Sequence, residues 1–315
     1  MYYPFFRGKQ FELIAIRENA ELLARSHFTP IIEPVKSNLV QLSKTVDSLI
    51  EKSVESIIIA NPGNGDFSDD PATIGDFLSQ KMSGHDGICP GILLSSKTPL
   101  DAALSQIDSF RNSRCAIIHD GFTQAKQLAA ELQSRKREYI HIFIDGNCTE
   151  MYQRHFLGPE RVLIRDGFIK RINRQYMDTE LFSDLHLTFD TIKRLSGFGD
   201  FLIVGYDYQE EGGPAYAVAL HLTYIDESQD GIMMIFHFVS DSRDSPADPA
   251  GKFAEALDKL CAKVEEQNSP ILRTSAVEEF LRLRESGHFP GLGYVKKLSM
   301  QHHLELMSHF FESRH

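Results

Sequence analysis

Three apolar runs in the sequence end in Asp-Gly, and their residue types and spacing suggest chemistry. The runs are "AIIHDGF", "IFIDGN" and "VLIRDGF", and they place Asp120, Asp145 and Asp166 directly after predicted strands. Glu33, within "PIIEPV", follows an earlier apolar run in the same way. Carboxylate oxygens are preferred ligands of hard divalent cations. If these four carboxylates converge, they predict a site for Mg²⁺ or Mn²⁺.

A metal held in this way would need neighbours that move protons and bind anions. His119 could act as an acid or base, and Arg165 or Lys36 could hold an anionic group, which together describe a metal-dependent phosphoester hydrolase. No contiguous motif such as HExxH or a P-loop accompanies these residues, and "NPGNGD" lacks the Lys-Ser/Thr ending of a Walker sequence. The sequence therefore leaves open whether the chain is an enzyme.

Turn chemistry explains the same aspartates without a metal. Asp-Gly after a strand supplies a residue that tolerates unusual dihedral angles, and Asp can also cap the following helix. Glu33 is less easily explained, because a carboxylate between two prolines has little local capping to do. Both interpretations stay open, and the aspartates become functional candidates only together with Glu33.

The elements that must position these residues follow a repeating pattern. From the first residues to about residue 208, short β-branched or aromatic runs alternate with longer amphipathic segments, as in βα units around a parallel sheet. We count eight strands, of which the first is interrupted by Pro4 and the last is "DFLIVGYDY", preceded by the helical pattern "TELFSDLHLTFDTIKRL". The pattern predicts a (β/α)8 TIM-barrel-like domain over residues 1–208, with a doubly wound open sheet as the alternative.

In such a barrel the C-terminal ends of the strands form the functional face, so polar residues there form the candidate site. A metal-free sugar-processing enzyme with two carboxylates would use the same face, although no sequence feature favours it. Besides Glu33, His119, Asp120 and Arg165 as candidate catalytic residues, the predicted ligand-binding residues are Arg7, Lys9, Lys36, Asn61 and Asp207.

The pattern changes after residue 208. The segments "PAYAVALHLTYID" and "GIMMIFHFVSD" predict an antiparallel hairpin, because only the polar turn "ESQDG" separates them. Helical patterns follow, so residues 209–315 are predicted to form a β-hairpin and C-terminal helices packed on the barrel. The "MMIF" segment is more apolar than a free edge strand should be, which predicts a homodimer or partner surface on the hairpin.

Two histidine pairs lie in this C-terminal region. His221 and His237 fall opposite or diagonal to one another on the hairpin, where they could share a proton or a metal, or simply lie on the polar face of the ribbon. His302 and His303 are adjacent on a helix and therefore about 100° apart, which is poor geometry for chelating one ion. For the second pair we expect a solvated or capping role.

Composition narrows the class of protein. A formal net charge of -11 opposes general nucleic-acid binding, although a local basic patch is compatible with it. Lys296 and Lys297, after "PGLGY", could bind an anion or lie solvated. The four cysteines are widely spaced and show no CxxC, so the sequence signals neither a zinc knuckle nor a redox dithiol. With no apolar run near the roughly 20 residues that span a bilayer, we expect no membrane segment and a cytoplasmic location.

Several segments together resemble a known family. In order along nearly the whole chain, "YYPFFRGKQFELIAIRE", "PIIEPVK", "FSDLH", "GFGDFLIVG", "AVALHLTY", "HFVSD" and "FPGLGYVKKLSMQHH" are similar to a bacterial family of largely uncharacterised proteins related to the phage-type Beta protein family. The match over "FRGKQFE" adds Glu12 to Arg7 and Lys9 as candidate site residues.

The resemblance implies an accessory protein of a defence-type (antiphage) module, acting with a nuclease-like partner encoded by a neighbouring gene. The expected function is therefore that of an accessory component that binds a partner or a nucleotide-like ligand. The alternative is the metal-dependent phosphoester hydrolase described above.

Overall fold

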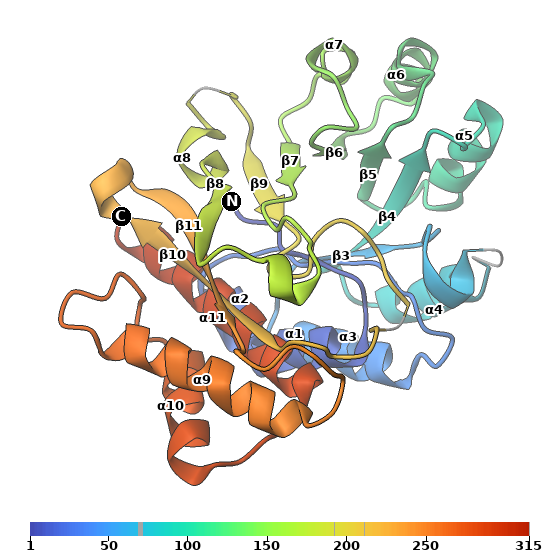
Figure 1. The fold of residues 1–315 in the computed structure, drawn as a ribbon. Coiled ribbons are helices and arrows are strands. Elements are labelled where there is room, and N and C mark those ends of the chain that lie inside the picture. Colours follow the sequence, from blue (N-terminus) through green and yellow to red (C-terminus); the bar gives the residue numbers. More distant parts are fainter. Residues whose placement is uncertain (69–71, 192, 211, 315) are drawn as a thin grey trace. The chain divides into compact units, whose positions relative to one another are not determined.

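The computed structural model describes residues 1–68, 72–191, 193–210 and 212–314. The chain divides into two compact units, which are shown in Figure 1. The first comprises residues 1–166 and 188–201, and the second comprises residues 167–187 and 202–315. The sequence placed a single division after residue 208, whereas the chain passes from one unit to the other three times, at residues 166/167, 187/188 and 201/202.

The first unit is the predicted (β/α)8 TIM-barrel-like fold. Its eight parallel strands are hydrogen-bonded in the order β1-β2-β3-β4-β5-β6-β7-β9. The ring is completed at the N-terminus, where the Tyr3 N–H donates to the Phe198 carbonyl at 2.8 Å and the Phe198 N–H donates to the Met1 carbonyl at 3.0 Å. The strands are β1 (Phe5–Phe6), β2 (Ile31–Ile32), β3 (Ser56–Ile59), β4 (Ile88–Ser95), β5 (Cys115–Asp120), β6 (Tyr139–Ile144), β7 (Arg161–Arg165) and β9 (Gly197–Asp200).

Helices follow most of these strands, and α5, α6 and α7 lie on the outer side of β4 to β7 (Figure 1). Their apolar residues recur at three- and four-residue steps, as in α3, which buries Leu42, Val46 and Leu49. The helical segments are α1 (Gln10–Glu18), α2 (Ala20–Arg25), α3 (Val40–Glu51), the 3-10 turn η1 (Gly65–Phe67), α4 (Ala72–Met82), α5 (Leu100–Ser109), α6 (Ala125–Ser134), α7 (Glu150–Gln153) and α8 (Leu185–Thr188), where the chain re-enters the first unit.

The last barrel strand begins three residues earlier than the sequence pattern predicted, at Gly197 rather than Asp200. A Cβ atom at Gly199 would lie 1.9 Å from the Tyr3 carbonyl oxygen, so the close approach that completes the ring requires glycine there. Because glycine is depleted in strands, the sequence pattern does not predict a strand at "GFGD". The apolar residues that follow it, Phe201 and Leu202, are buried after the strand has ended.

The second unit is built on a three-stranded antiparallel sheet in the order β10-β11-β8. The predicted hairpin is confirmed as β10 (Ala219–Asp226) and β11 (Ile232–Val239). The segment predicted as a helix before the last barrel strand instead forms β8 (Thr179–Ser183), and only a short turn of helix, α8, follows it. The other helical segments are η2 (Asn173–Gln175), η3 (Glu227–Gln229), α9 (Pro249–Glu265), α10 (Ser275–Ser286) and α11 (Leu292–Glu312).

Pairing on both sides removes the basis for predicting a dimer through β11. Met234 lies opposite Tyr224 of β10 on one side and Leu181 of β8 on the other, so β11 is the central strand and not an edge. Met233 and Ile235 are each 1% exposed. The apolar "MMIF" segment is therefore explained by burial within one chain.

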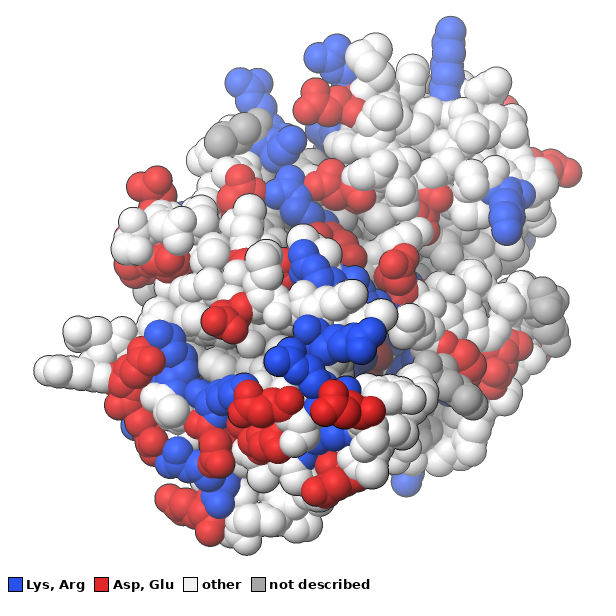
Figure 2. Space-filling model, viewed as in Figure 1, with Lys and Arg blue, Asp and Glu red and all other residues white. Residues whose placement is uncertain are grey.

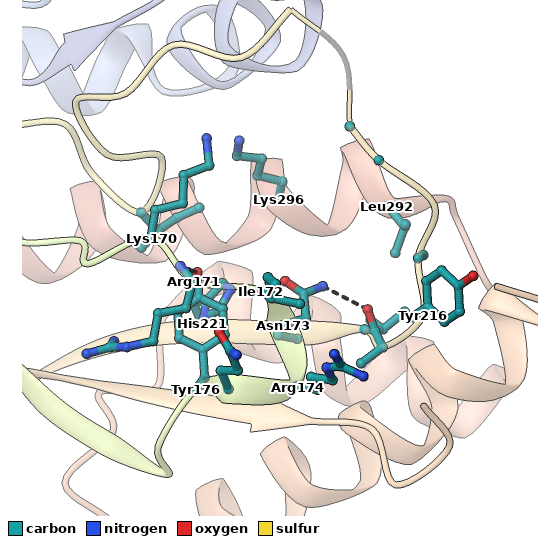
Figure 3. A pocket seen from close by; sticks show the side chains of 18 of the residues that line it. Lys170, Arg171, Ile172, Asn173, Arg174, Tyr176, Tyr216, His221, Leu292 and Lys296 are labelled. Atoms are coloured by element: carbon teal, nitrogen blue, oxygen red, sulfur yellow. Dashed lines mark hydrogen bonds between the residues drawn. The ribbon is translucent and has the colours of Figure 1, made fainter. Parts of the chain in front are cut away.

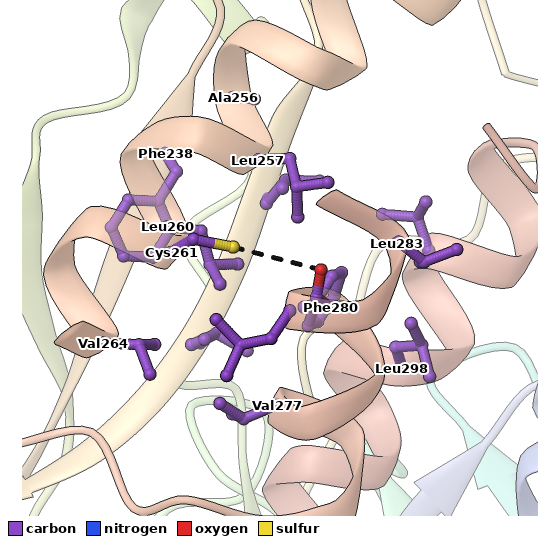
Figure 4. Close-up of a cluster of buried hydrophobic side chains, with 14 of the residues drawn as sticks. Phe238, Ala256, Leu257, Leu260, Cys261, Val264, Val277, Phe280, Leu283 and Leu298 are labelled. Carbon is purple, nitrogen blue, oxygen red and sulfur yellow. Dashed lines mark hydrogen bonds between the residues drawn. The ribbon is translucent and has the colours of Figure 1, made fainter. Parts of the chain in front are cut away.

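The core of the second unit lies between the sheet and its helices. Leu220 and Leu222 of β10 pack against side chains from α9 and α10, among them Leu260 and Phe280 (Figure 4). The Sγ atom of Cys261 lies 3.9 Å from the Phe280 carbonyl oxygen in this cluster. Among the described residues, no helix has the length and apolar character needed to cross a bilayer.

Candidate functional site

Glu33, the residue that turn chemistry explained least, is fully buried directly after β2. Its carboxylate forms an ion pair with Arg7, which is 6% exposed. The same carboxylate accepts the backbone N–H groups of Gly63 at 3.0 Å and Asn64 at 3.1 Å, and the Asn64 side-chain amide at 3.1 Å. Protein donors therefore occupy this carboxylate, which ties the ends of β1 and β2 to the loop after β3.

Two of the three Asp-Gly aspartates contact polar side chains of the barrel. Asp120 accepts from the Asn147 side chain at 2.6 Å, and Asp145 pairs with the Arg165 guanidinium at 2.7 Å. Asp166 is exposed after β7.

The structure does not assemble the predicted metal site. Within the part of the chain that the structure describes, no group of three or more His, Cys, Asp or Glu side chains could hold a metal ion. The four carboxylates predicted to hold Mg²⁺ or Mn²⁺ end or follow four different strands and form no such group. Those carboxylates are Glu33, Asp120, Asp145 and Asp166.

His119 lies under α7 on the helix-covered side of β5 and not at the strand-end face. Its Nδ1 atom lies 2.7 Å from the Tyr152 hydroxyl, and its Nε2 atom lies 3.0 Å from His141 Nδ1. The ring stacks on Phe143 and is completely buried. Burial, with a smaller effect of His141, holds the pKa of His119 well below its usual value. Successive residues of a strand face opposite sides of the sheet. A side chain one position earlier or later in β5 would therefore face away from α7.

The remaining predicted ligand-binding residues of the barrel lie apart. The Asn61 amide donates to the Leu93 carbonyl and to Gln106, each at 2.8 Å, so it joins β3 to the strand and helix that follow. Lys9 is the N-cap residue of α1. Lys36 is exposed and lines a cavity of about 340 Å³ with Asp66.

A larger cavity, of about 840 Å³, lies within the second unit (Figure 3). Its walls come from residues 168–176, from the segment that leads into β10, and from the first turns of α11. One described lining residue, Asp207, is acidic, and it is the predicted ligand-binding residue that the structure places in this unit. The basic lining residues are Lys170, Arg171, Arg174 and Lys296.

These four cations differ in their contacts with the rest of the protein. Arg171 forms an ion pair with Glu180, with Nη1 to carboxylate distances of 2.5 and 2.7 Å, and Lys170 donates to the Asp207 carbonyl at 3.3 Å. Arg174 and Lys296 are exposed, and neither has an ion pair among the residues that the structure describes. The ammonium groups of Lys170 and Lys296 point in the same direction in Figure 3.

The unpaired cations of the cavity contrast with the surface over α9 and α10. There basic and acidic side chains are interspersed, as Figure 2 shows. Arg284 pairs with Glu265 at 3.0 Å, and Lys263 pairs with Glu266 at 2.6 Å. Cations on that surface are neutralised by the protein itself, whereas Arg174 and Lys296 are available to an anion.

Sequence reasoning found part of this cavity. Lys296 was a candidate anion-binding residue, but its neighbour Lys297 is buried, with its ammonium group 4.5 Å from the Tyr294 ring centroid. The remaining cations lie in "KRINR", residues 170–174, which carries three basic residues in five positions of a chain with a net charge of -11. That local basic patch was the signal that could have located the cavity.

The predicted histidine pair of the hairpin is confirmed and extends to a carboxylate. His221 and His237 lie directly opposite each other, with their Nδ1 atoms 2.7 Å apart. The Nε2 atom of His237 lies 2.9 Å from a carboxylate oxygen of Glu180. Burial lowers the pKa of His237 to about 4 and that of His221 well below its usual value. His221 lines the cavity, so this chain of polar groups ends at its wall.

His302 and His303, expected to be solvated or to cap a helix, are both completely buried. His302 Nε2 lies 2.7 Å from the Thr223 carbonyl oxygen, and its Nδ1 lies 2.9 Å from the Thr274 hydroxyl. His303 Nδ1 lies 2.8 Å from the Thr223 hydroxyl. Both rings join α11 to β10, and His302 also reaches the N-cap of α10.

Comparison of the sequence with models of known protein families found no match. No curated protein matched it either. The chemistry of the two units must therefore indicate the function. In the barrel, the polar strand-end residues mostly engage each other. In the second unit, exposed cations and a histidine pair, His221 half-buried and His237 buried, lie around one cavity.

Proposed function

We propose that the protein is a ligand-binding protein that takes up a phosphorylated, nucleotide-like molecule in the cavity of its second unit. The observation that carries this proposal is the exposure of Arg174 and Lys296 on one cavity, without an ion pair among the described residues. Guanidinium and ammonium groups bind phosphate through charge-assisted hydrogen bonds. A volume of about 840 Å³ also lies within the range of roughly 300–1,000 Å³ that is typical of ligand pockets.

The other lining residues favour a nucleotide over a bare anion. Tyr176 and Tyr216 provide aromatic rings, and Ile172 and Leu292 are large apolar side chains that are 60% and 41% exposed. Tyr216 is itself 46% exposed. Aromatic and apolar surface beside a cationic group suits a ligand with a planar base and a phosphate.

The accessory role in a defence-type module, which the family resemblance implies, is part of the same proposal. The alternative, a metal-dependent phosphoester hydrolase, requires converging carboxylates, and the described residues contain no group of three or more His, Cys, Asp or Glu that could hold a metal ion. Co-expression with the product of the neighbouring gene should yield one complex in size-exclusion chromatography at both low and raised salt. Separate elution of the two proteins would count against a partner.

Replacing either exposed cation by alanine should weaken nucleotide binding. We expect at least one of the four ribonucleoside triphosphates to bind in isothermal titration calorimetry, and Lys296→Ala or Arg174→Ala each to weaken that binding roughly tenfold, as loss of a charge-assisted hydrogen bond would. Raised salt should weaken binding to the native protein, because the contacts are screened.

The matched control is Lys259→Ala. Lys259 lies on α9 and pairs with Asp241 at 2.7 Å outside the cavity, so its removal should leave affinity unchanged. Failure of all four nucleotides to bind the native protein would overturn the proposed function. So would an equal loss of affinity in the cavity variants and in this control.

A further inference from the structure

We propose that His221 Nε2 is a fixed hydrogen-bond acceptor in the cavity, set by Glu180 through His237, and that it selects nucleotides whose sugar is ribose over their deoxy counterparts. This inference rests on the proposed function and identifies the ligand class more closely. It follows from where the protons on the two imidazole rings must lie. Those positions can be assigned from the polar contacts in three steps.

Glu180 determines the first proton. Its side chain is 7% exposed, and its ion pair with Arg171 stabilises the ionised carboxylate, which can only accept hydrogen bonds. One of its oxygens lies 2.9 Å from His237 Nε2. The contact does not have hydrogen-bond geometry, but a lone pair on Nε2 would face the negative oxygen. The proton of a neutral His237 ring is therefore on Nε2, and Nδ1 is left with a lone pair.

His237 determines the second proton. Its Nδ1 atom lies 2.7 Å from His221 Nδ1, and at this distance one of the two atoms must carry a proton and the other must accept it. Since His237 Nδ1 is the acceptor, His221 Nδ1 is the donor. Burial and the nearby charge of Lys296 both lower the pKa of His221, which keeps its ring neutral at pH 7. The lone pair of His221 therefore lies on Nε2.

The surroundings hold His221 in place and leave Nε2 open. Phe168 and Tyr176 contact its ring edge to face, with centroid distances of 5.0 and 4.9 Å. Among the described residues, nothing hydrogen-bonds to Nε2, while His221 lines the cavity beside Tyr176 (Figure 3). Tyr176 also stacks on His237 at 4.5 Å, so one aromatic ring braces both imidazoles.

An acceptor in this position restricts which anions fit. Lys296 and Arg174 are donors that suit phosphate oxygens, but a phosphate ionised at neutral pH offers His221 no proton to accept. A ribose hydroxyl close to the phosphate supplies the missing donor. A ribonucleotide therefore satisfies both kinds of group, whereas the deoxynucleotide that lacks the hydroxyl facing His221 leaves a lone pair of the wall without a partner, which costs affinity.

The test compares sugars on one base. The ribonucleoside triphosphate that binds best is titrated against its 2′-deoxy and 3′-deoxy counterparts by isothermal titration calorimetry. We expect the native protein to bind the ribonucleotide roughly tenfold more tightly than at least one deoxy form, the loss of one uncharged hydrogen bond. In His221→Phe, which keeps an aromatic ring, this preference should disappear while deoxynucleotide affinity stays within about twofold.

A spectroscopic measurement on the native protein keeps the inference testable if His221→Phe does not fold. Long-range ¹H–¹⁵N NMR spectra of the imidazole rings should show His221 Nε2 and His237 Nδ1 unprotonated at pH 7, and Glu180→Gln should change this pattern. Equal binding of ribonucleotide and both deoxy forms, or a protonated His221 Nε2, would overturn this inference and leave the proposed function intact. If no nucleotide binds at all, both fail.

Discussion

Glu33→Ala is expected to lower the unfolding free energy by about 3–5 kcal/mol, the usual cost of removing one partner of a buried ion pair. The substitution removes the carboxylate that faces the guanidinium of Arg7, which is 6% exposed. It also removes the acceptor of the Gly63 and Asn64 backbone N–H groups. Urea unfolding followed by circular dichroism would measure the change, with the midpoint and slope compared between variant and native protein.

Two further variants distinguish the stability cost of breaking the buried ion pair from the cost of removing any carboxylate. Glu33→Gln keeps the shape and one acceptor oxygen, so its cost should be smaller than that of alanine but still measurable. Glu55→Ala removes a carboxylate that is 63% exposed and pairs with Arg114 at 3.3 Å, and it should cost less than about 1 kcal/mol. Unchanged stability in Glu33→Ala would contradict the structural role and return Glu33 to the candidate catalytic residues.

The barrel could be predicted because its signal is local and repeated. Each βα unit carries its own alternation of apolar run and amphipathic helix, and eight of them specify the fold even where one is weak. The two strands that were predicted wrongly, β8 and β9, share a cause. The strand "GFGD" is made of residues that strands disfavour, and β8 (Thr179–Ser183) alternates over only five residues before pairing with β11, far along the chain.

The candidate site was harder to predict because it depends on side-chain direction and on distant segments. His119 lies in the strand where the pattern predicts it, but its ring faces α7. A shift of one residue along the strand would turn the side chain to the opposite face. The cavity joins residues 168–176 to β10 and to α11, which begins more than 100 residues later. Periodicity says nothing about which loops meet. The pairing of His221 with His237 was predictable, because a hairpin with a short turn fixes which residues lie opposite.

Acidification from pH 6.5 to pH 4 should destabilise the protein, because His302 is buried without charge. Burial lowers the pKa of His302 in the folded protein from its ordinary value of 6.5 to about 4, while the unfolded chain takes up the proton near 6.5. The stability that depends on the neutral ring is therefore complete above pH 6.5 and is lost as the pH falls toward 4. At about 1.4 kcal/mol per pKa unit, His302 alone accounts for about 3 kcal/mol of this loss.

Urea titrations at several pH values would measure this slope, and His302→Gln should flatten it. A glutamine amide can donate to the Thr223 carbonyl and accept from the Thr274 hydroxyl, as the imidazole does, but it does not titrate. We expect His302→Gln to be less stable than the native protein at pH 7, yet to lose less stability on acidification. His288→Gln, at an exposed position, should leave the slope unchanged. An undiminished slope in His302→Gln would show that other buried histidines, such as His237, carry the acid sensitivity, because the pKa of His237 is also lowered to about 4.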